Sequence, residues 1–165
     1  MKKVLFFAAL SLFSASIFAE GYVSANDLDE GTVQGKMALD DGFAILASAE
    51  KAVVIDKAGD SPIPKNADGE SFNRRINLKG AGNTATRCVS FPVKAGETIT
   101  VDCQTSSKTD SRTLVIVDSD GNNVLSVSAA PGEVKRGSAK ASKAGTYYAY
   151  SSKGGMYIYQ IDVKK

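Results

Sequence analysis

The runs Gly145-Thr-Tyr-Tyr-Ala-Tyr-Ser151 and Met156-Tyr-Ile-Tyr-Gln-Ile-Asp-Val163 decide the fold of this chain. Both are rich in aromatic and β-branched residues, and a short polar loop with two glycines separates them. Two such runs joined by such a loop predict a β-hairpin that closes a sheet. Alternation along the second run puts Tyr157 and Tyr159 on the same face as Ile161, so we expect these two tyrosines to pack in the core.

Shorter runs of strand length fill the rest of the chain and alternate with turn signals such as Asp-Gly, Ala-Gly and Pro-Gly. These runs are residues 43–47, 52–56, 72–78, 87–93, 98–104, 113–118, 123–129 and 134–141. The stretch 113–117 is apolar on both faces, which indicates a central strand. Because no long amphipathic helix stands out, the pattern predicts an all-β fold, an antiparallel β-sandwich or jelly roll of roughly eight to ten strands.

Four motifs, in their order along the chain, resemble accessory β-sandwich modules of bacterial secreted pectate lyases. They are the segments 72–82, 87–91, 111–121 and 145–161, and the similarity extends over residues 31–163. Cys88, where an aromatic residue is more usual, and the inserted loop 60–67 depart from the family pattern. The resemblance implies a sandwich that binds carbohydrate without cleaving it, and by analogy a pectin-type ligand.

Residues 1–19 have the composition of a bacterial export signal, in which Lys2 and Lys3 precede an apolar run that ends at Ala19. The run is too short for a membrane anchor, and no cysteine follows it to accept a lipid. Residues 20–31 are polar and are expected to form a flexible leader, followed by one sandwich domain over residues 32–165. We therefore expect an exported protein, periplasmic or extracellular, that is not inserted in a membrane.

Charge and composition exclude several functions. Removal of Lys2 and Lys3 with the signal leaves 18 of the 20 Lys and Arg against 18 Asp and Glu, so no basic excess speaks for nucleic acid. Histidine is absent, which excludes catalytic groups with an imidazole base and the usual zinc sites. A lyase needs a base beside a bound cation along a sugar groove, and no such group stands out. The sequence predicts that the protein is not an enzyme.

Cys88 and Cys103 lie in strands that are neighbours in the sequence, and a disulfide is permitted in an exported chain. A hairpin in which Val93 faces Thr98 places the two cysteines opposite each other, but it sets the apolar residues of one strand against polar residues of the other. A shift by one residue buries a consistent face and separates the cysteines. A disulfide stays open at this point, and the hydrophobic pattern favours two separate thiols with Cys103 buried.

Asp118, Asp120 and Asn122 have the alternate spacing with which calcium-binding loops begin. The residues that follow supply no carboxylate to complete such a loop. Asp-Gly and Asn equally suit the turn of a β-hairpin. We expect a hairpin turn and no cofactor, and a structural calcium ion stays open as the alternative.

The candidate carbohydrate-binding residues are two tyrosines and three arginines. Tyr148 and Tyr150 project from one face of their strand, where exposed rings would stack on the apolar faces of sugars. Arg75, Arg87 and Arg112 match arginines of the family pattern, and guanidinium pairs well with the carboxylates of acidic glycans. For each of the five, packing or pairing within the sandwich is the structural alternative.

The sequence thus favours an exported, non-catalytic carbohydrate-binding module with a pectin-like polysaccharide as its partner. A structural or adhesive protein of the cell envelope, whose sheet edge or apolar patch contacts another protein, is the alternative. A small polysaccharide lyase is the third hypothesis, against which the absence of histidine speaks.

Overall fold

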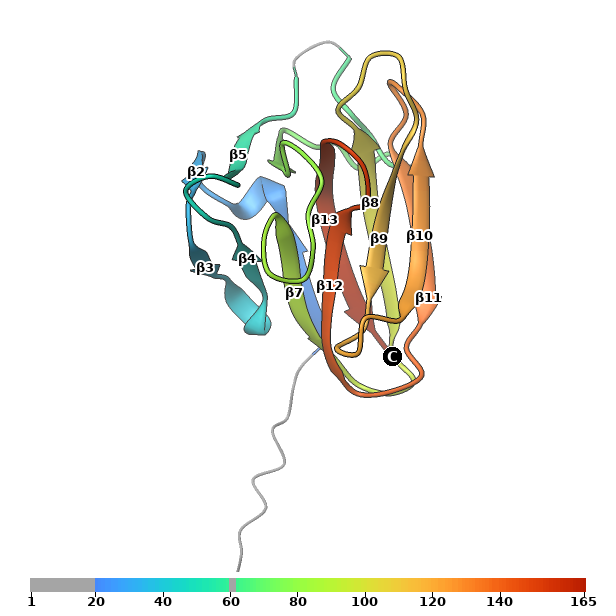
Figure 1. Ribbon diagram of the computed structural model, residues 1–165. Helices are drawn as coiled ribbons and strands as arrows, with labels where there is room; N and C mark the ends of the chain where they lie inside the picture. The colour runs from blue at the N-terminus through green and yellow to red at the C-terminus, as the bar shows by residue number, and fades with distance from the viewer. Residues whose placement is uncertain (1–19, 60–61) are drawn as a thin grey trace, which may run out of the picture.

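The computed structural model describes residues 20–59 and 62–165, and the predicted export signal lies outside them. Within this part of the chain, thirteen β-strands form two antiparallel sheets that pack face to face (Figure 1). The predicted all-β sandwich is confirmed. The strands outnumber the roughly eight to ten expected, because β1, β2 and β3, of three or four residues each, are too short to stand out as a pattern.

Sheet A has seven strands in the order β11-β8-β13-β6-β5-β2, and β1 pairs with β13 at the edge that β6 leaves free. Its strands are β1 (Gly21–Ser24), β2 (Gly31–Val33), β5 (Val53–Lys57), β6 (Arg74–Asn77), β8 (Thr98–Thr105), β11 (Lys135–Lys140) and β13 (Met156–Lys164). A 3-10 helix, η1 (Ala25–Asp27), follows β1.

Sheet B has six strands in the order β10-β9-β12-β7-β4-β3. Its strands are β3 (Lys36–Ala38), β4 (Ala44–Leu46), β7 (Cys88–Val93), β9 (Arg112–Val117), β10 (Asn123–Ala129) and β12 (Gly145–Ser151). A second 3-10 helix, η2 (Asp40–Gly42), connects β3 and β4. Strand β9 lies between β10 and β12, so the prediction of a central strand from its two apolar faces is confirmed.

The main core lies between the two sheets and is built from their inward-facing side chains. Phe91 stacks on Phe43, with ring centroids 5.3 Å apart, and on Tyr147 at 6.4 Å. Full burial of each such ring contributes roughly 1.5–3 kcal/mol, and these three rings fill one end of the core. The Tyr147 hydroxyl donates to the Lys143 carbonyl oxygen at 2.8 Å, and burial raises the pKa of this phenol.

The predicted hairpin of the two aromatic runs is wrong. β12 lies in sheet B and β13 in sheet A, so the loop 152–155 crosses from one layer to the other. Each strand finds its partners far away in the sequence: β12 pairs with β7 and β9, and β13 with β8, β6 and β1. Alternation and turn chemistry are the same for a loop within one sheet and a loop between two, which is why the sequence suggested the simpler arrangement.

The same correction applies to the two cysteine-bearing strands. β7 belongs to sheet B and β8 to sheet A, so neither hairpin register considered for them exists. Cys88 and Cys103 are free thiols, both fully buried, in agreement with the preference for two separate thiols. Burial raises the pKa of each to about 12, so both stay protonated at neutral pH.

A β-bulge at Tyr159 interrupts the alternation of β13. Ile158 pairs with Cys103 and Gln160 with Asp102, so Tyr159 is an extra residue between them. The expectation that Tyr157 and Tyr159 share the core with Ile161 is therefore wrong. Tyr159 is fully buried, but in a second apolar cluster outside sheet A, stacked on Phe72 with centroids 4.7 Å apart, and Tyr157 packs beside it half-buried.

The segment 20–31 is not a flexible leader. Val23 of β1 faces Ile161 of β13, and Val23 and Ala25 belong to the main core. The few apolar residues of this polar segment were enough for one strand and one turn, because β13 offers an unpaired edge. The sandwich therefore begins near Gly21 rather than at residue 32.

Candidate functional site

The outer surface of β7, β9 and β12 forms a surface that we call the tyrosine face. Alternation along β12 buries Tyr147 in the core and turns Tyr148 and Tyr150 outward, where both are half-buried. Tyr148 lies between β7 and β9 opposite Ser90, and Tyr150 is next to it on the same side of the strand, about 6.8 Å along. The flanking strands support both rings, so the two tyrosines share one surface.

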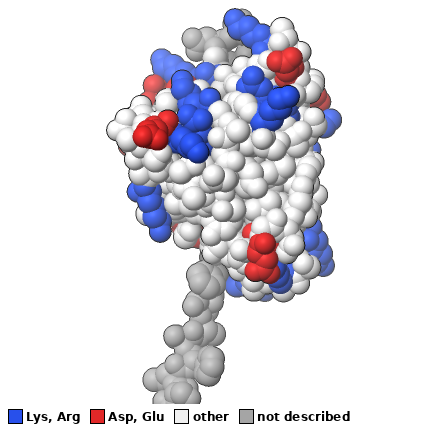
Figure 2. All heavy atoms as spheres, in the orientation of Figure 1, with Lys and Arg blue, Asp and Glu red and all other residues white. Residues whose placement is uncertain are grey.

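The tyrosine face carries no charge. Outward positions of β7, β9, β10 and β12 hold only neutral side chains: Pro92, Thr113, Val115, Ser126, Ser128, Thr146, Tyr148 and Tyr150 at the surface, and Cys88, Ser90 and Val117 buried among them. Figure 2 views this side of the molecule, and the middle of the surface is free of acidic and basic groups. Apolar side chains and hydroxyl groups thus alternate over several strands, which suits a ligand that has both C–H faces and hydroxyls.

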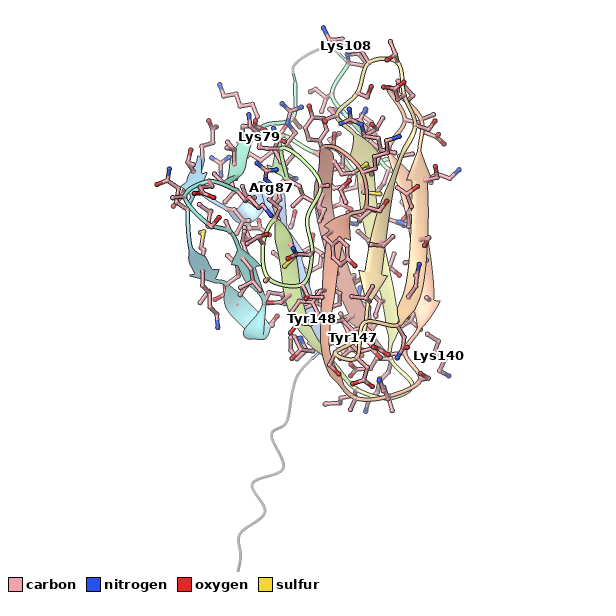
Figure 3. The ribbon with its side chains drawn as sticks, viewed as in Figure 1. Lys79, Arg87, Lys108, Lys140, Tyr147 and Tyr148 are labelled. Carbon is pink, nitrogen blue, oxygen red and sulfur yellow. The ribbon has the colours of Figure 1, made fainter. Side chains whose placement is uncertain are left out.

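A loop, residues 79–87, borders the tyrosine face beyond Tyr150. Lys79 and Arg87 both have a positive φ, 61° and 52°, and Figure 3 shows them beside each other in the loop in front of β7. The Gly82 amide donates to the Ser151 carbonyl oxygen at 3.0 Å, which fixes the loop to the end of β12. The Arg87 side chain lies against Gly80, and its Nε has no hydrogen-bond partner among the residues that the structure describes.

The other two candidate arginines lie elsewhere. Arg75, on β6, is on the outer surface of sheet A, and its Nε donates to Asp56 Oδ1 at 2.5 Å. Arg112 is at the loop end of β9, where its Nη1 donates to Ser106 Oγ at 3.1 Å and to the Gly155 carbonyl oxygen at 3.0 Å. The structure therefore brings Tyr148, Tyr150 and Arg87 to sheet B, holds Arg112 at the end of β9 in the same sheet, and places Arg75 on the other sheet.

The candidate calcium loop is the turn of the β9–β10 hairpin. Both Asp118 oxygens accept hydrogen bonds: Oδ1 from the amides of Asp120 and Asn122 at 2.8 and 3.0 Å, Oδ2 from Asn122 Nδ2 at 3.0 Å. Lys143 Nζ forms an ion pair with Asp118 at 3.0 Å and a further one with Asp120. The hydrogen bond from the Asn122 side chain, with smaller contributions from Lys143 and two amides, lowers the pKa of Asp118 well below its usual range.

These donors give the turn the role that its sequence equally predicted. An ammonium group and N–H donors occupy the oxygens that a cation would need. Over residues 20–59 and 62–165, no group of three or more acidic or cysteine side chains is arranged to hold a metal ion. No helix in these ranges is long and apolar enough to cross a membrane.

Sequence reasoning missed the contributions of Lys79 and Tyr157. Lys79 reaches the rim of the tyrosine face through a backbone conformation that lysine rarely adopts, and no sequence pattern announces it. Tyr157 lies under the Arg75 guanidinium, with Cζ 3.9 Å from the ring centroid. The register of β6 against β13 brings the two together, and only the structure gives this register.

Comparison with known proteins shows similarity in fold and none in sequence families. No protein-family profile and no curated protein sequence matches the chain. Among solved structures, it is similar to the CBM22-1 xylan-binding domain of Xyn10C from Paenibacillus barcinonensis, with 14% identity over 87% of this chain and 91% of that one and a TM-score of 0.52. This likeness is one of fold.

A second neighbour is the CBM22-1-GH10 structure of xylanase 10B from Clostridium thermocellum in complex with xylohexaose. It is 12% identical over 81% of this chain, with a TM-score of 0.51, and the match covers 29% of that longer chain. Both of these structural neighbours contain a carbohydrate-binding module, CBM22-1, which is an accessory β-sandwich domain. At this identity the comparison transfers the sandwich architecture and leaves the ligand to be argued from the surface itself.

Proposed function

We propose that this protein is an exported, non-catalytic module that binds polysaccharide on the tyrosine face. The observation that carries the proposal is the pair Tyr148 and Tyr150, two half-buried rings on one uncharged sheet surface. Support for the class comes from the fold, which is shared with a xylan-binding domain. Support for export comes from the composition of residues 1–19.

The chemistry of the face suits a sugar chain. Pyranose rings present C–H groups that pack on aromatic rings, and their hydroxyls need donors and acceptors nearby. Thr113, Thr146 and Ser126 supply hydroxyls on neighbouring strands, on the same surface as Tyr148 and Tyr150. Because strands on both sides hold the rings, little side-chain entropy is lost on binding, which favours affinity.

The loop 79–87, which we call the rim loop, favours an acidic glycan of the pectin type as the ligand. Lys79 and Arg87 are beside each other in the loop at the end of the tyrosine face, and both carry a positive charge. A polysaccharide that stacks on Tyr150 and carries carboxylates would meet these two cations next. Acidic specificity therefore depends on the rim loop, whereas binding as such depends on the tyrosines.

The proposal excludes catalysis by this domain. A lyase needs a base and a cation close together at a groove, and the tyrosine face has neither carboxylate nor imidazole. The carboxylates that directly follow strand β9, Asp118 and Asp120, both form ion pairs with Lys143.

Affinity electrophoresis in gels that contain xylan or polygalacturonate tests the proposal. We expect the double variant Tyr148→Ala/Tyr150→Ala to lose retardation in the xylan gel and to be retarded less in the polygalacturonate gel, and Arg87→Gln to be retarded less with polygalacturonate only. Tyr22→Ala is the matched control, because Tyr22 is 41% exposed on the outer surface of sheet A. Retardation of the double variant equal to that of the Tyr22 variant would refute binding on the tyrosine face. Self-association with no retardation by any glycan would instead support an adhesive envelope protein.

A further inference from the structure

A pocket of about 630 Å³ opens on the other side of the sandwich, at one end of the outer surface of sheet A. Its floor consists of Arg75 from β6, Gln104 from β8 and Tyr157 from β13. Its walls come from three loops, which contribute residues 62–65 and 105–108, together with Pro131, Gly132 and Val134. Pockets of roughly 300–1,000 Å³ are of the size that holds small ligands, so this one accommodates one or two sugar units.

Arg75 is fixed in the floor by three contacts. Its guanidinium lies over the Tyr157 ring at 3.9 Å, its Nε donates to Asp56 Oδ1, and its Nη1 reaches the Ala58 carbonyl oxygen at 3.5 Å. Asn77 Nδ2 holds the second oxygen of Asp56 at 3.1 Å, so the anchor itself is held. Within the described chain Arg75 Nη2 has no hydrogen-bond partner, which leaves an oriented donor at the pocket.

The rest of the floor is rigid as well. The Tyr159 hydroxyl donates to Gln104 Oε1, and the Tyr159 ring stacks on Phe72 of the covering loop. The Gln104 side chain is therefore held by its oxygen, while its amide nitrogen remains available to an acceptor in the pocket. The floor thus presents two hydrogen-bond donors, the charged Arg75 on β6 and the neutral Gln104 on β8. Tyr157 lies between them on β13.

The charge of the lining is of one sign. Lys65 and Lys108 stand exposed at the rim, and Figure 3 shows Lys108 at the tip of its loop. Among the described residues that line the pocket there is no aspartate or glutamate. Asp56 balances one of the three cations from behind the floor, so the described residues of the lining carry a net positive charge.

We propose that this pocket binds a carboxylate-bearing sugar unit, a uronate, with Arg75 and Gln104 as donors to the carboxylate and the Tyr157 ring holding the Arg75 guanidinium in place. The site is independent of the tyrosine face, because the two surfaces belong to different sheets and face in opposite directions. The protein would then hold acidic glycan at two places and link two chains or two parts of one chain.

Calorimetric titration of digalacturonate into the Tyr148→Ala/Tyr150→Ala protein isolates the pocket from the tyrosine face. Arg75→Lys keeps the charge but removes the planar fork, and we expect it to weaken binding about tenfold or more. The double variant Lys65→Gln/Lys108→Gln, exposed and remote from the core, should weaken it about two- to fivefold and make it less sensitive to salt. Xylobiose, which has no carboxylate, should not bind.

Arg74→Gln is the control, because Arg74 is the neighbouring arginine, pairs with Glu30 and does not line the pocket. Thermal unfolding of each variant shows whether it is folded. If Arg75→Lys does not fold, the Lys65→Gln/Lys108→Gln variant still tests the proposal. Equal affinity of the Arg74 and lysine-pair variants, or equal binding of xylobiose, would overturn the proposal. A failure here leaves the affinity gels of the tyrosine face unaffected, so the two proposals fall separately.

Discussion

The outer surfaces of the two sheets differ in the charge of their side chains. Outward positions of sheet A carry charged side chains, among them three ion pairs: Asp56 with Arg75, Asp102 with Arg136, and Asp162 with Lys164. The central outward positions of sheet B carry tyrosines and small neutral residues. One sheet thus uses its outer side chains to pair with one another and with its own loops, whereas the central outer side chains of the other sheet are uncharged.

Sheet A is covered by the long β5–β6 connection through a buried network. Asp102 is fully buried, and its carboxylate accepts from Arg136 Nε at 2.9 Å and Nη2 at 2.7 Å and from Gln160 Nε2 at 2.7 Å. Asn66, at 3.2 Å, brings the loop into the network, and Arg136 also pairs with Asp68 there. The hydrogen bonds to Asp102 raise the pKa of Arg136 above its ordinary value. Stability on this side depends on outward groups to an extent that the tyrosine face does not match.

Removing Asp102 should have the largest effect. Asp102→Ala leaves Arg136, Gln160 and Asn66 without their common acceptor in a buried site, which costs about 3–5 kcal/mol of unfolding free energy. Urea denaturation measures the change. Asp162→Ala is the control on the same surface, because Asp162 forms an ion pair with the exposed Lys164 and with no other residue that the structure describes, and it should change stability by about 1 kcal/mol or less. Similar losses in the two variants would contradict the buried network.

The backbone of the rim loop offers an intermediate effect of opposite sign. Lys79 has φ 61°, a conformation that costs an L-residue roughly 1–2 kcal/mol and glycine almost nothing. Lys79→Gly removes this backbone strain and should raise the unfolding free energy. The gain should be at most about 1 kcal/mol, because the greater entropy of glycine in the unfolded chain offsets part of it. Lys79→Ala removes the same side chain and keeps the strain, so it should show no such gain. A gain in both variants would point to the charge rather than to the backbone.

The tyrosine face should tolerate truncation. Half-buried cross-strand pairs contribute roughly 0.2–1 kcal/mol, so we expect Tyr148→Ala to reduce stability by about 1 kcal/mol or less while it reduces glycan binding. Thermal unfolding and affinity gels on the same sample separate the two effects. A loss comparable to that of Asp102→Ala would remove the contrast between the two surfaces and give the tyrosines a structural role.

The smallest effect concerns acid pH. Because hydrogen bonds depress the folded-state pKa of Asp118, its stabilisation is complete above the unfolded pKa, about 3.9, and disappears as the pH falls through the folded value. Asp118→Asn should therefore be less stable than the wild type at pH 6, and the difference should shrink steadily below about pH 4. Urea midpoints at both pH values measure it. A difference independent of pH would mean that the turn needs the shape of Asp118 and not its charge.

Composition and alternation predicted the class of fold and the inward and outward sets of most strands. The pattern placed Tyr148 and Tyr150 on one side of a strand, and the structure has them there. Pairing was not predictable in the same way, because alternation is a property of one strand and says nothing about its neighbour. The loops 94–97 and 152–155 therefore looked like hairpin turns, although both cross between the sheets.

The remaining errors have the same local origin. A single extra residue, Tyr159, reverses the alternation of β13 without any unusual residue to announce it. Gly21–Ser24 looked too polar for the fold, but it completes an edge that only β13 creates. The arginines matched a family pattern in sequence, yet Arg75 and Arg87 lie over different sheets, so a shared motif gave no information about a shared site.

The extra residue in β13 also governs which length changes the strand can accept. On one side of Tyr159 the inward residues are Met156 and Ile158, and on the other they are Ile161 and Val163. An insertion or deletion of one residue between these pairs would exchange inside and outside over half the strand, exposing aliphatic groups and pulling the ring of Tyr159 from its stack on Phe72. Gaps in the chains of true relatives should therefore fall in the loops and spare this strand.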